Sequence, residues 1–279
     1  MTEHVLIQVG DDVDIHCRLD GPEDGLPVVL LHGYMGNGTQ WDESVAGLVA
    51  TGHRVVRPDF RGHGGSTDVG DEEAYTFDAL RADTIAVVDA LGIDSFHLVG
   101  QSMGGLVATL VAIGDGDRLQ SLMLVDCSPL PGRSGSALAA RLRRVVAYRV
   151  GAHRLLRWLA PVLSRISVGQ DPARSTADRR RAIDDLAVIV GDLDPAAFVA
   201  FWNALQRHDD LRPRLDAIRV PTTVIVGEHE IDRLRAGAEA LEHGIAGAVL
   251  VEIPGAGHSP PMERPEAFTD ALLHHLLLV

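Results

Sequence analysis

The sequence has very little cysteine and no lysine at all. Its two cysteines, Cys17 and Cys127, show no C-x-x-C spacing and no framework of pairs, so both are expected to be free, buried thiols. All 25 basic residues are arginines, and against 39 acidic residues they leave a formal net charge of −14. Such a charge repels polyanions, which argues against nucleic acid or an anionic membrane surface as a general partner. A small molecule is the expected partner.

The sequence also lacks the features of an exported or membrane-spanning chain. It starts Met-Thr-Glu-His, without a basic segment followed by an apolar one, and no apolar run approaches the roughly 18 residues that a membrane span needs. We therefore expect a cytoplasmic protein. Apolar residues make up 46% of the chain, which is ample for a core, and 279 residues allow one large domain or a domain with an insertion.

Strand and helix patterns alternate along most of the chain. Alternating apolar and polar residues, broken near Gly10, predict an antiparallel hairpin from residue 5 to 19. Further strands, most of them continuously apolar, are predicted at 28–31, 54–57, 96–100, 119–125, 222–227 and 249–253. Helices are predicted at 41–50, 77–91, from 103, at 233–242 and at 265–278. This order predicts an α/β fold with a mostly parallel central sheet flanked by helices on both faces.

The strand pattern disappears between residues 130 and 214. Four helical stretches take its place, separated by Gly151, by 169–172 and by 191–195. We therefore expect a core domain made of residues 1–129 and 215–279, with an all-helical insertion at 130–214. Twelve of the arginines fall between residues 133 and 181, and they are interpreted as the solvated faces of amphipathic helices. The alternative is that they recognise an anionic substrate.

Ser102 stands at the sharpest predicted turn of the chain. A buried strand runs into Gly100-Gln101-Ser102-Met103-Gly104, and an apolar helix follows at once. Glycines two residues before and after Ser102 remove the Cβ atoms that would clash in such a turn, so only the apex side chain is pushed outward. The helix also directs its free N–H groups at the place where an oxyanion would form. The pattern predicts a nucleophilic serine.

A serine nucleophile needs a base, and His258 is the best placed of the 13 histidines. It follows the last predicted strand in a Gly-Ala-Gly-His loop, at the carboxyl edge of the sheet where Ser102 also lies. The backbone N–H groups of Tyr34 and Met103 are the expected oxyanion donors. The rings of His32 and His63 are expected to brace their loops rather than to transfer protons.

Four motifs together resemble the α/β-hydrolase superfamily. They are His-Gly-x-x-Gly at His32, Asp-x-Arg-Gly-His-Gly-x-Ser at Asp59, Gly-x-Ser-Met-Gly-Gly at Gly100 and Pro-Gly-Ala-Gly-His at Pro254. The sequence is similar to the branch that holds esterases, enol-lactone hydrolases, carbon–carbon bond hydrolases and cofactor-free perhydrolases. By this resemblance the fold is the α/β-hydrolase fold, the insertion is a helical cap over the active site, and no metal or organic cofactor is implied.

The resemblance leaves the acid of the triad open. Similar family members carry an aspartate three residues after the glycine that ends the strand, and here Glu230 occupies that position. Glutamate is longer by one methylene but can still orient the histidine. A minority of the family takes its acid from the end of the preceding strand, where Asp126 lies. We predict Glu230, with Asp126 as the alternative acid and Asp232 third.

These residues predict a serine hydrolase, of the carboxylesterase or lactonase type, that acts on small to medium esters, lactones or related carbonyl compounds in an apolar pocket under the cap. A nucleophilic aspartate would have implied dehalogenase or epoxide hydrolase chemistry, and Ser102 argues against both. One rival is a cofactor-free oxygenase or lyase, in which His258 and the acid abstract a proton and Ser102 only binds. Another is a ligand-binding receptor on the same fold.

Overall fold

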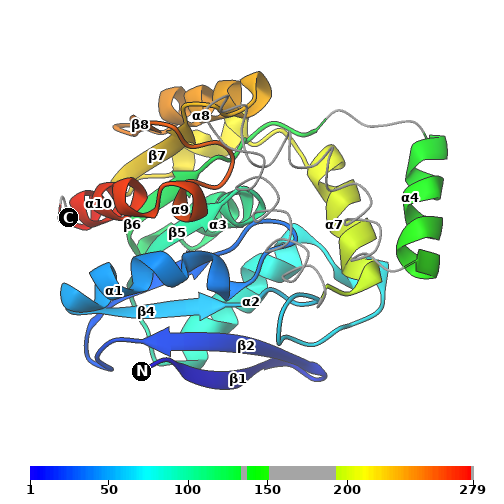
Figure 1. Ribbon diagram of the computed structural model, residues 1–279, viewed down its shortest axis with the longest axis horizontal. Coiled ribbons are helices and arrows are strands. Elements are labelled where there is room, and N and C mark those ends of the chain that lie inside the picture. Colours follow the sequence, from blue (N-terminus) through cyan, green and yellow to red (C-terminus); the bar gives the residue numbers. More distant parts are fainter. Residues whose placement is uncertain (133–136, 151–192, 278–279) are drawn as a thin grey trace.

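The computed structural model describes residues 1–132, 137–150 and 193–277. An eight-stranded sheet in the order β1-β2-β4-β3-β5-β6-β7-β8 forms its centre (Figure 1). β1 pairs with β2 and β2 with β4 antiparallel, and every other pairing is parallel. The strands are β1 (Glu3–Gly10), β2 (Val13–Asp20), β3 (Leu26–Leu31), β4 (His53–Pro58), β5 (Phe96–Gln101), β6 (Leu119–Val125), β7 (Thr222–Gly227) and β8 (Val249–Ile253). The predicted hairpin and mostly parallel sheet are confirmed.

The parallel strands are apolar throughout because both of their faces are covered. In β3, Val28 and Leu30 point into one core while Val29 and Leu31 point into the other, and all four are fully buried. The first core is closed by α1 (Asp42–Ala50) and α10 (Pro265–Leu276). The second lies under α2 (Phe77–Ala90), α3 (Met103–Gly114) and α8 (Asp232–Gly244). The alternation thus sorts the helices onto the two faces.

Several short elements were not predicted. They are α9 (Pro260–Glu263) and the 3-10 turns η1 (Gly38–Trp41), η2 (Glu72–Ala74), η3 (Gly116–Arg118) and η5 (Arg212–Ala217). Each has six residues or fewer, which is too short for a helical repeat of apolar residues to show in the sequence.

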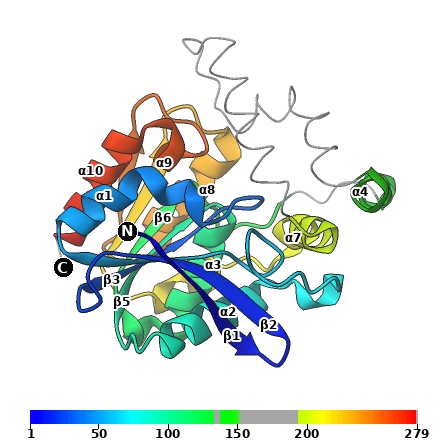
Figure 2. The same ribbon diagram turned by 60° about the horizontal axis from the view of Figure 1, so that its bottom comes forward.

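Two helices of the insertion are described, α4 (Ala137–Val150) and α7 (Pro195–Arg207). Both views place α4 farthest from the sheet, on the far side of α7 (Figures 1 and 2). The predicted helical stretches between them, and most of the clustered arginines, lie in 151–192, outside the described residues. Of that cluster, Arg144 is exposed and pairs with Glu72 at 3.2 Å. The domain boundaries at 129/130 and 214/215 stay a prediction.

Asp194 fastens the start of α7 to the core. Its carboxylate caps the helix by accepting the Ala196 N–H, and it also accepts hydrogen bonds from the Tyr75 hydroxyl and the Gly70 N–H. Burial and the bond to Asp194 raise the pKa of Tyr75, so the hydroxyl keeps its proton and remains a donor. Both cysteines are buried free thiols. No helix within the described ranges is long and apolar enough to cross a membrane.

Candidate active site

Ser102 lies between β5 and α3 in a backbone conformation that residues other than glycine rarely adopt, with φ at 53° and ψ at −112°. Its N–H donates to the Val125 carbonyl at 2.8 Å, which ties the turn to the neighbouring strand β6. A Cβ on Gly100 would lie 2.3 Å from the Gly104 carbonyl, and a Cβ on Gly104 would lie 2.3 Å from the Leu31 carbonyl. Only glycines allow these approaches, so both are required for the turn that exposes the serine.

The structure brings Ser102, His258 and Glu230 into one line. Ser102 Oγ lies 3.0 Å from His258 Nε2, and His258 Nδ1 lies 2.5 Å from Glu230 Oε2. The second Glu230 oxygen accepts the Ile231 N–H at 2.7 Å, so both carboxylate oxygens have partners. The Glu230 side chain is 1% exposed and that of His258 22%. The arrangement fits a base that faces the nucleophile while an acid fixes its orientation.

The electrostatics of His258 are set by the acid beside it. Burial disfavours the imidazolium, but the acidic groups around it together outweigh burial, Glu230 foremost by its charge and its hydrogen bond, and the pKa of His258 rises to about 9. An imidazolium at this position would therefore be well stabilised. In the neutral ring, Nδ1–H donates to Glu230 and the lone pair on Nε2 faces Ser102.

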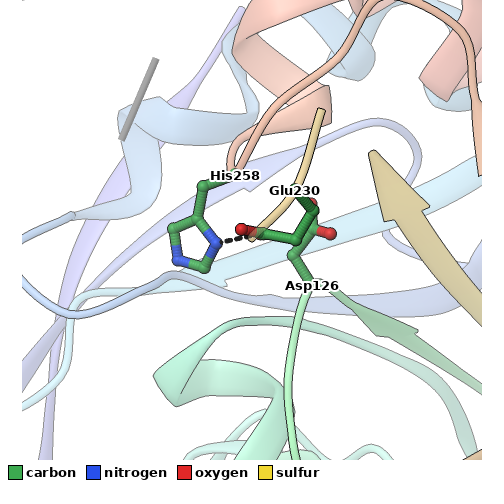
Figure 3. A group of neighbouring side chains, drawn as sticks. All are labelled: Asp126, Glu230 and His258. Atoms are coloured by element: carbon green, nitrogen blue, oxygen red, sulfur yellow. Dashed lines mark hydrogen bonds and ion pairs between the residues drawn. The ribbon is translucent and has the colours of Figure 1, made fainter. Parts of the chain in front are cut away.

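The two other candidate acids occupy different places. Asp126 follows β6 in a left-handed conformation, with φ at 44°, and is fully buried. Its Oδ1 accepts the Gly227 N–H at 3.0 Å, and it lies beside Glu230 without a hydrogen bond to His258 (Figure 3). Burial and the Glu230 charge raise the pKa of Asp126 well above its usual value. Asp232 starts α8 with an exposed side chain. Of the three carboxyl groups, Glu230 contacts the histidine.

The expected oxyanion donors belong to two segments that meet at Ser102. Met103 is the first residue of α3, where an N–H has no acceptor inside the helix. Tyr34 lies in the loop after β3, which His32 braces: its Nδ1–H donates to the Gly33 carbonyl at 2.8 Å and its Nε2 accepts the Phe60 N–H at 2.9 Å. Burial lowers the pKa of His32, so the ring stays neutral in this role.

Two glutamines that sequence reasoning missed connect the parts of the site. Gln101 Nε2–H donates to the His258 carbonyl at 2.6 Å, while its Oε1 accepts from Gln40 Nε2 at 3.4 Å. Gln40 Oε1 in turn accepts the Gly33 N–H at 3.1 Å. The chain of bonds joins the histidine loop to the loop of Tyr34. No sequence signal marks Gln40, whereas the place of Gln101 directly before Ser102 could have indicated it.

The glycine-rich loop after β4 is organised by one buried carboxylate. Asp59 accepts hydrogen bonds from Arg18, His16 and the N–H groups of Gly38 and Gly65, at distances from 2.6 to 3.0 Å. Burial raises the pKa of Asp59, but hydrogen bonds, from His16 above all and from the Gly65 and Gly38 N–H groups, help to hold the pKa well below its usual value. His63 in the same loop donates to the Arg61 carbonyl at 3.1 Å, and burial lowers its pKa to about 3. These contacts brace the loop and place His63 away from proton transfer.

One cluster in the described part of the chain has metal-binding residue types in reach of each other. Each of Asp126, Glu230 and His258 offers one potential ligand atom, and these three atoms lie within 4.8 Å of one another (Figure 3). However, His258 and Glu230 already bond directly at 2.5 Å, which leaves no space for an ion between them, and Asp126 Oδ1 is taken by Gly227. The geometry therefore fits an acid–histidine pair better than a metal centre.

Comparison with known proteins identifies the family of the chain. The sequence matches the family described as "Alpha/beta hydrolase family" over residues 28–271. Among curated relatives, the putative carbamate hydrolase RutD of Variovorax paradoxus is 27% identical over 271 residues, which is 95% of this chain and 97% of that protein. A pimeloyl-(acyl-carrier protein) methyl ester esterase of Nitrosomonas europaea is 29% identical over 262 residues, with 91% and 96% covered.

A similar solved structure supports the same family. The enol-lactonase from Burkholderia xenovorans LB400 matches with a TM-score of 0.83 and 27% identity, over 99% of this chain and 100% of that one. The matched family segment includes every residue of the candidate site, from Tyr34 to His258.

Proposed function

The chain belongs to the α/β-hydrolase family and is an enzyme, and we propose that it is a serine hydrolase whose catalytic triad is Ser102, His258 and Glu230. The observation that carries the proposal is the unbroken line from Ser102 Oγ to His258 Nε2 at 3.0 Å and from Nδ1 to Glu230 at 2.5 Å. A serine hydroxyl is a weak nucleophile on its own, and this contact gives it a base with an oriented ring.

Acyl transfer on this site proceeds in two halves. Ser102 Oγ attacks the substrate carbonyl carbon while its proton passes to His258 Nε2, and the Tyr34 and Met103 N–H groups bind the oxyanion that forms. His258 then protonates the leaving oxygen, the carbon–oxygen bond breaks, and the acyl group stays on Ser102. Water enters, His258 takes one of its protons, and hydroxide adds to the acyl carbon. Ser102 regains its proton as the carboxylic acid leaves.

The proposed substrates are small to medium esters or lactones. The names of two similar proteins support this class: the relative from Nitrosomonas europaea is a methyl ester esterase, and the similar structure from Burkholderia xenovorans is an enol-lactonase. In the oxygenase or lyase alternative, Ser102 only binds the substrate. A serine within hydrogen-bond distance of the base favours the hydrolase over this alternative.

Covalent labelling tests the nucleophile directly. A fluorophosphonate probe should form a bond from its phosphorus to Ser102 Oγ as fluoride leaves and the hydroxyl proton is lost, seen as one adduct by mass spectrometry. Ser102→Ala should abolish both the adduct and the turnover of a chromogenic ester and lactone panel. The variant should fold normally because the glycines, not the hydroxyl, fix the turn. Retention of most ester turnover by Ser102→Ala would remove the proposal.

A further inference from the structure

Asp126 is a buried carboxyl group that the proposed reaction leaves without a task. It has no exposed surface, and it follows β6 with a φ of 44°, a conformation that is uncommon outside glycine. Its Oδ1 accepts one N–H, from Gly227, and its Oδ2 is buried without a hydrogen-bond partner in the described part of the chain. An ionised carboxylate kept away from water with one oxygen unpaired is very costly, so its proton has to be accounted for.

The position of Asp126 brings it to the acid of the triad. β6 and β7 are parallel neighbours with Val125 opposite Ile225, so the residues after both strands meet at one edge of the sheet. Asp126 points toward Glu230 from the adjacent strand (Figure 3), and both lie within 4.8 Å of His258 by their ligand atoms. Two buried carboxyl groups this close do not both ionise.

The partners decide which of the two carries the charge. Glu230 bonds to His258 through one oxygen and accepts the Ile231 N–H through the other, whereas Asp126 has a single N–H donor. A carboxylate with more donors keeps its charge, so Glu230 is the ionised member and Asp126 holds the proton. The raised pKa of Asp126 agrees with this assignment.

We propose that Asp126 is a reserve acid: it stays neutral while Glu230 is charged, and it ionises to orient His258 when the Glu230 charge is removed. The inference rests on the proposed function, because it concerns the same proton-transfer chain. Asp126 is thus a positioning residue that acts through His258. The other ionisable groups around it are Glu263 of α9 and the adjacent Cys127. Burial raises the pKa of the Cys127 thiol, so this thiol carries no charge.

A double-mutant cycle tests the reserve role. With an activated ester, Glu230→Gln should lower kcat roughly 100-fold, because Asp126 replaces part of the lost function, and Asp126→Asn should lower it only a few-fold. The kcat of the double variant should fall roughly 10⁴-fold, far more than the product of the two single losses, since no acid remains. Additive losses would overturn the proposal.

A pH profile separates this role from a structural one. In Glu230→Gln, the ionised Asp126 should keep the His258 pKa above its value in the double variant. The rising limb of kcat/KM should therefore lie at higher pH in Glu230→Gln than in the double variant. Coincident limbs would overturn the reserve role. Thermal unfolding of each variant shows whether it is folded, and Asp126→Asn keeps the shape and hydrogen-bonding capacity that the neutral acid has.

Glu263→Gln supplies the matched control. Glu263 is a third carboxylate near His258, but its oxygens already accept the Gly257 and Ser259 N–H groups at 2.9 Å. Combined with Glu230→Gln, it should give additive losses. The failure of the proposed function looks different: fluorophosphonate would then leave Ser102 unlabelled in the wild-type protein, whereas the reserve role alone fails when labelling is normal and the cycle is additive.

Discussion

The Tyr34 hydroxyl donates a hydrogen bond of 2.6 Å to the main-chain carbonyl of Phe198, which joins the loop after β3 to helix α7. The Tyr34 ring also stacks on that of Phe198, with centroids 5.8 Å apart, and lies 6.2 Å from the ring of Trp202. The backbone N–H of Tyr34 is the oxyanion donor proposed above. One side chain therefore links the inserted helix to the geometry of the oxyanion site.

Removing that hydroxyl should affect catalysis more than substrate binding. Tyr34→Phe keeps the ring packing but loses the bond to Phe198, so we expect kcat to fall roughly 3- to 10-fold with a smaller change in KM, because the oxyanion forms only in the transition state. Tyr148→Phe is the control, since the Tyr148 hydroxyl also joins the insertion to the core, at Glu72, but away from Ser102. Equal kinetics for the two variants would contradict the link.

The length of the acid side chain should matter in a graded way. Glu230→Asp restores the residue usual in similar family members but shortens the reach by one methylene, so the 2.5 Å contact with His258 is loosened rather than abolished. Steady-state kinetics should show a loss of roughly 10-fold, smaller than that of Glu230→Gln. The prediction fails if the aspartate variant is as impaired as the glutamine variant.

The activity should rise with pH as His258 loses its proton. The base must be neutral to accept the Ser102 proton, and although burial lowers its pKa, the acidic groups around it, Glu230 foremost, raise that pKa to about 9, above the usual 6.5. Without carboxylates beside it the imidazolium is less stabilised, so the double variant Glu230→Gln/Asp126→Asn, which also lacks the reserve acid, should move the rising limb of kcat/KM to lower pH. A limb that stays in place in the double variant would show that another group titrates.

Asp59 should stabilise the fold in a pH-dependent way. Asp59→Asn leaves buried donors and Arg18 without a charged acceptor, and we expect a loss of about 3 kcal/mol in the free energy of unfolding. The native pKa of Asp59 lies below its unfolded value, so this stability is present above about pH 4 and is lost as the pH falls through the native pKa. Urea unfolding from pH 7 down to pH 3 should show the gap between the two proteins narrowing. A gap that is constant with pH would contradict the assignment.

The sheet could be predicted from the sequence because its information is local. Apolar runs predicted the bounds of β6, β7 and β8 as the structure has them, with Pro221 directly before β7 and Pro254 directly after β8. The turn at Ser102 and the loop of His258 were also predictable, since each depends on glycines within two or three residues of the functional side chain. The four-residue helix α9 was missed because it is shorter than the repeat by which helices are identified.

The sequence by itself determined which residue types lie at the carboxyl edge of the sheet: a serine after β5, an aspartate after β6, a glutamate after β7 and a histidine after β8. Only the tertiary structure decided which acid contacts His258. Asp126 and Glu230 follow adjacent parallel strands, so their positions in the sequence do not tell which side chain reaches His258. The contact depends on how the loop after β7 turns. The same holds for Gln40, Gln101 and the Tyr34–Phe198 bond. Apart from the local Gln40–Gly33 bond, these groups are 61 or more residues from their partners in sequence, and packing alone brings them within hydrogen-bond distance.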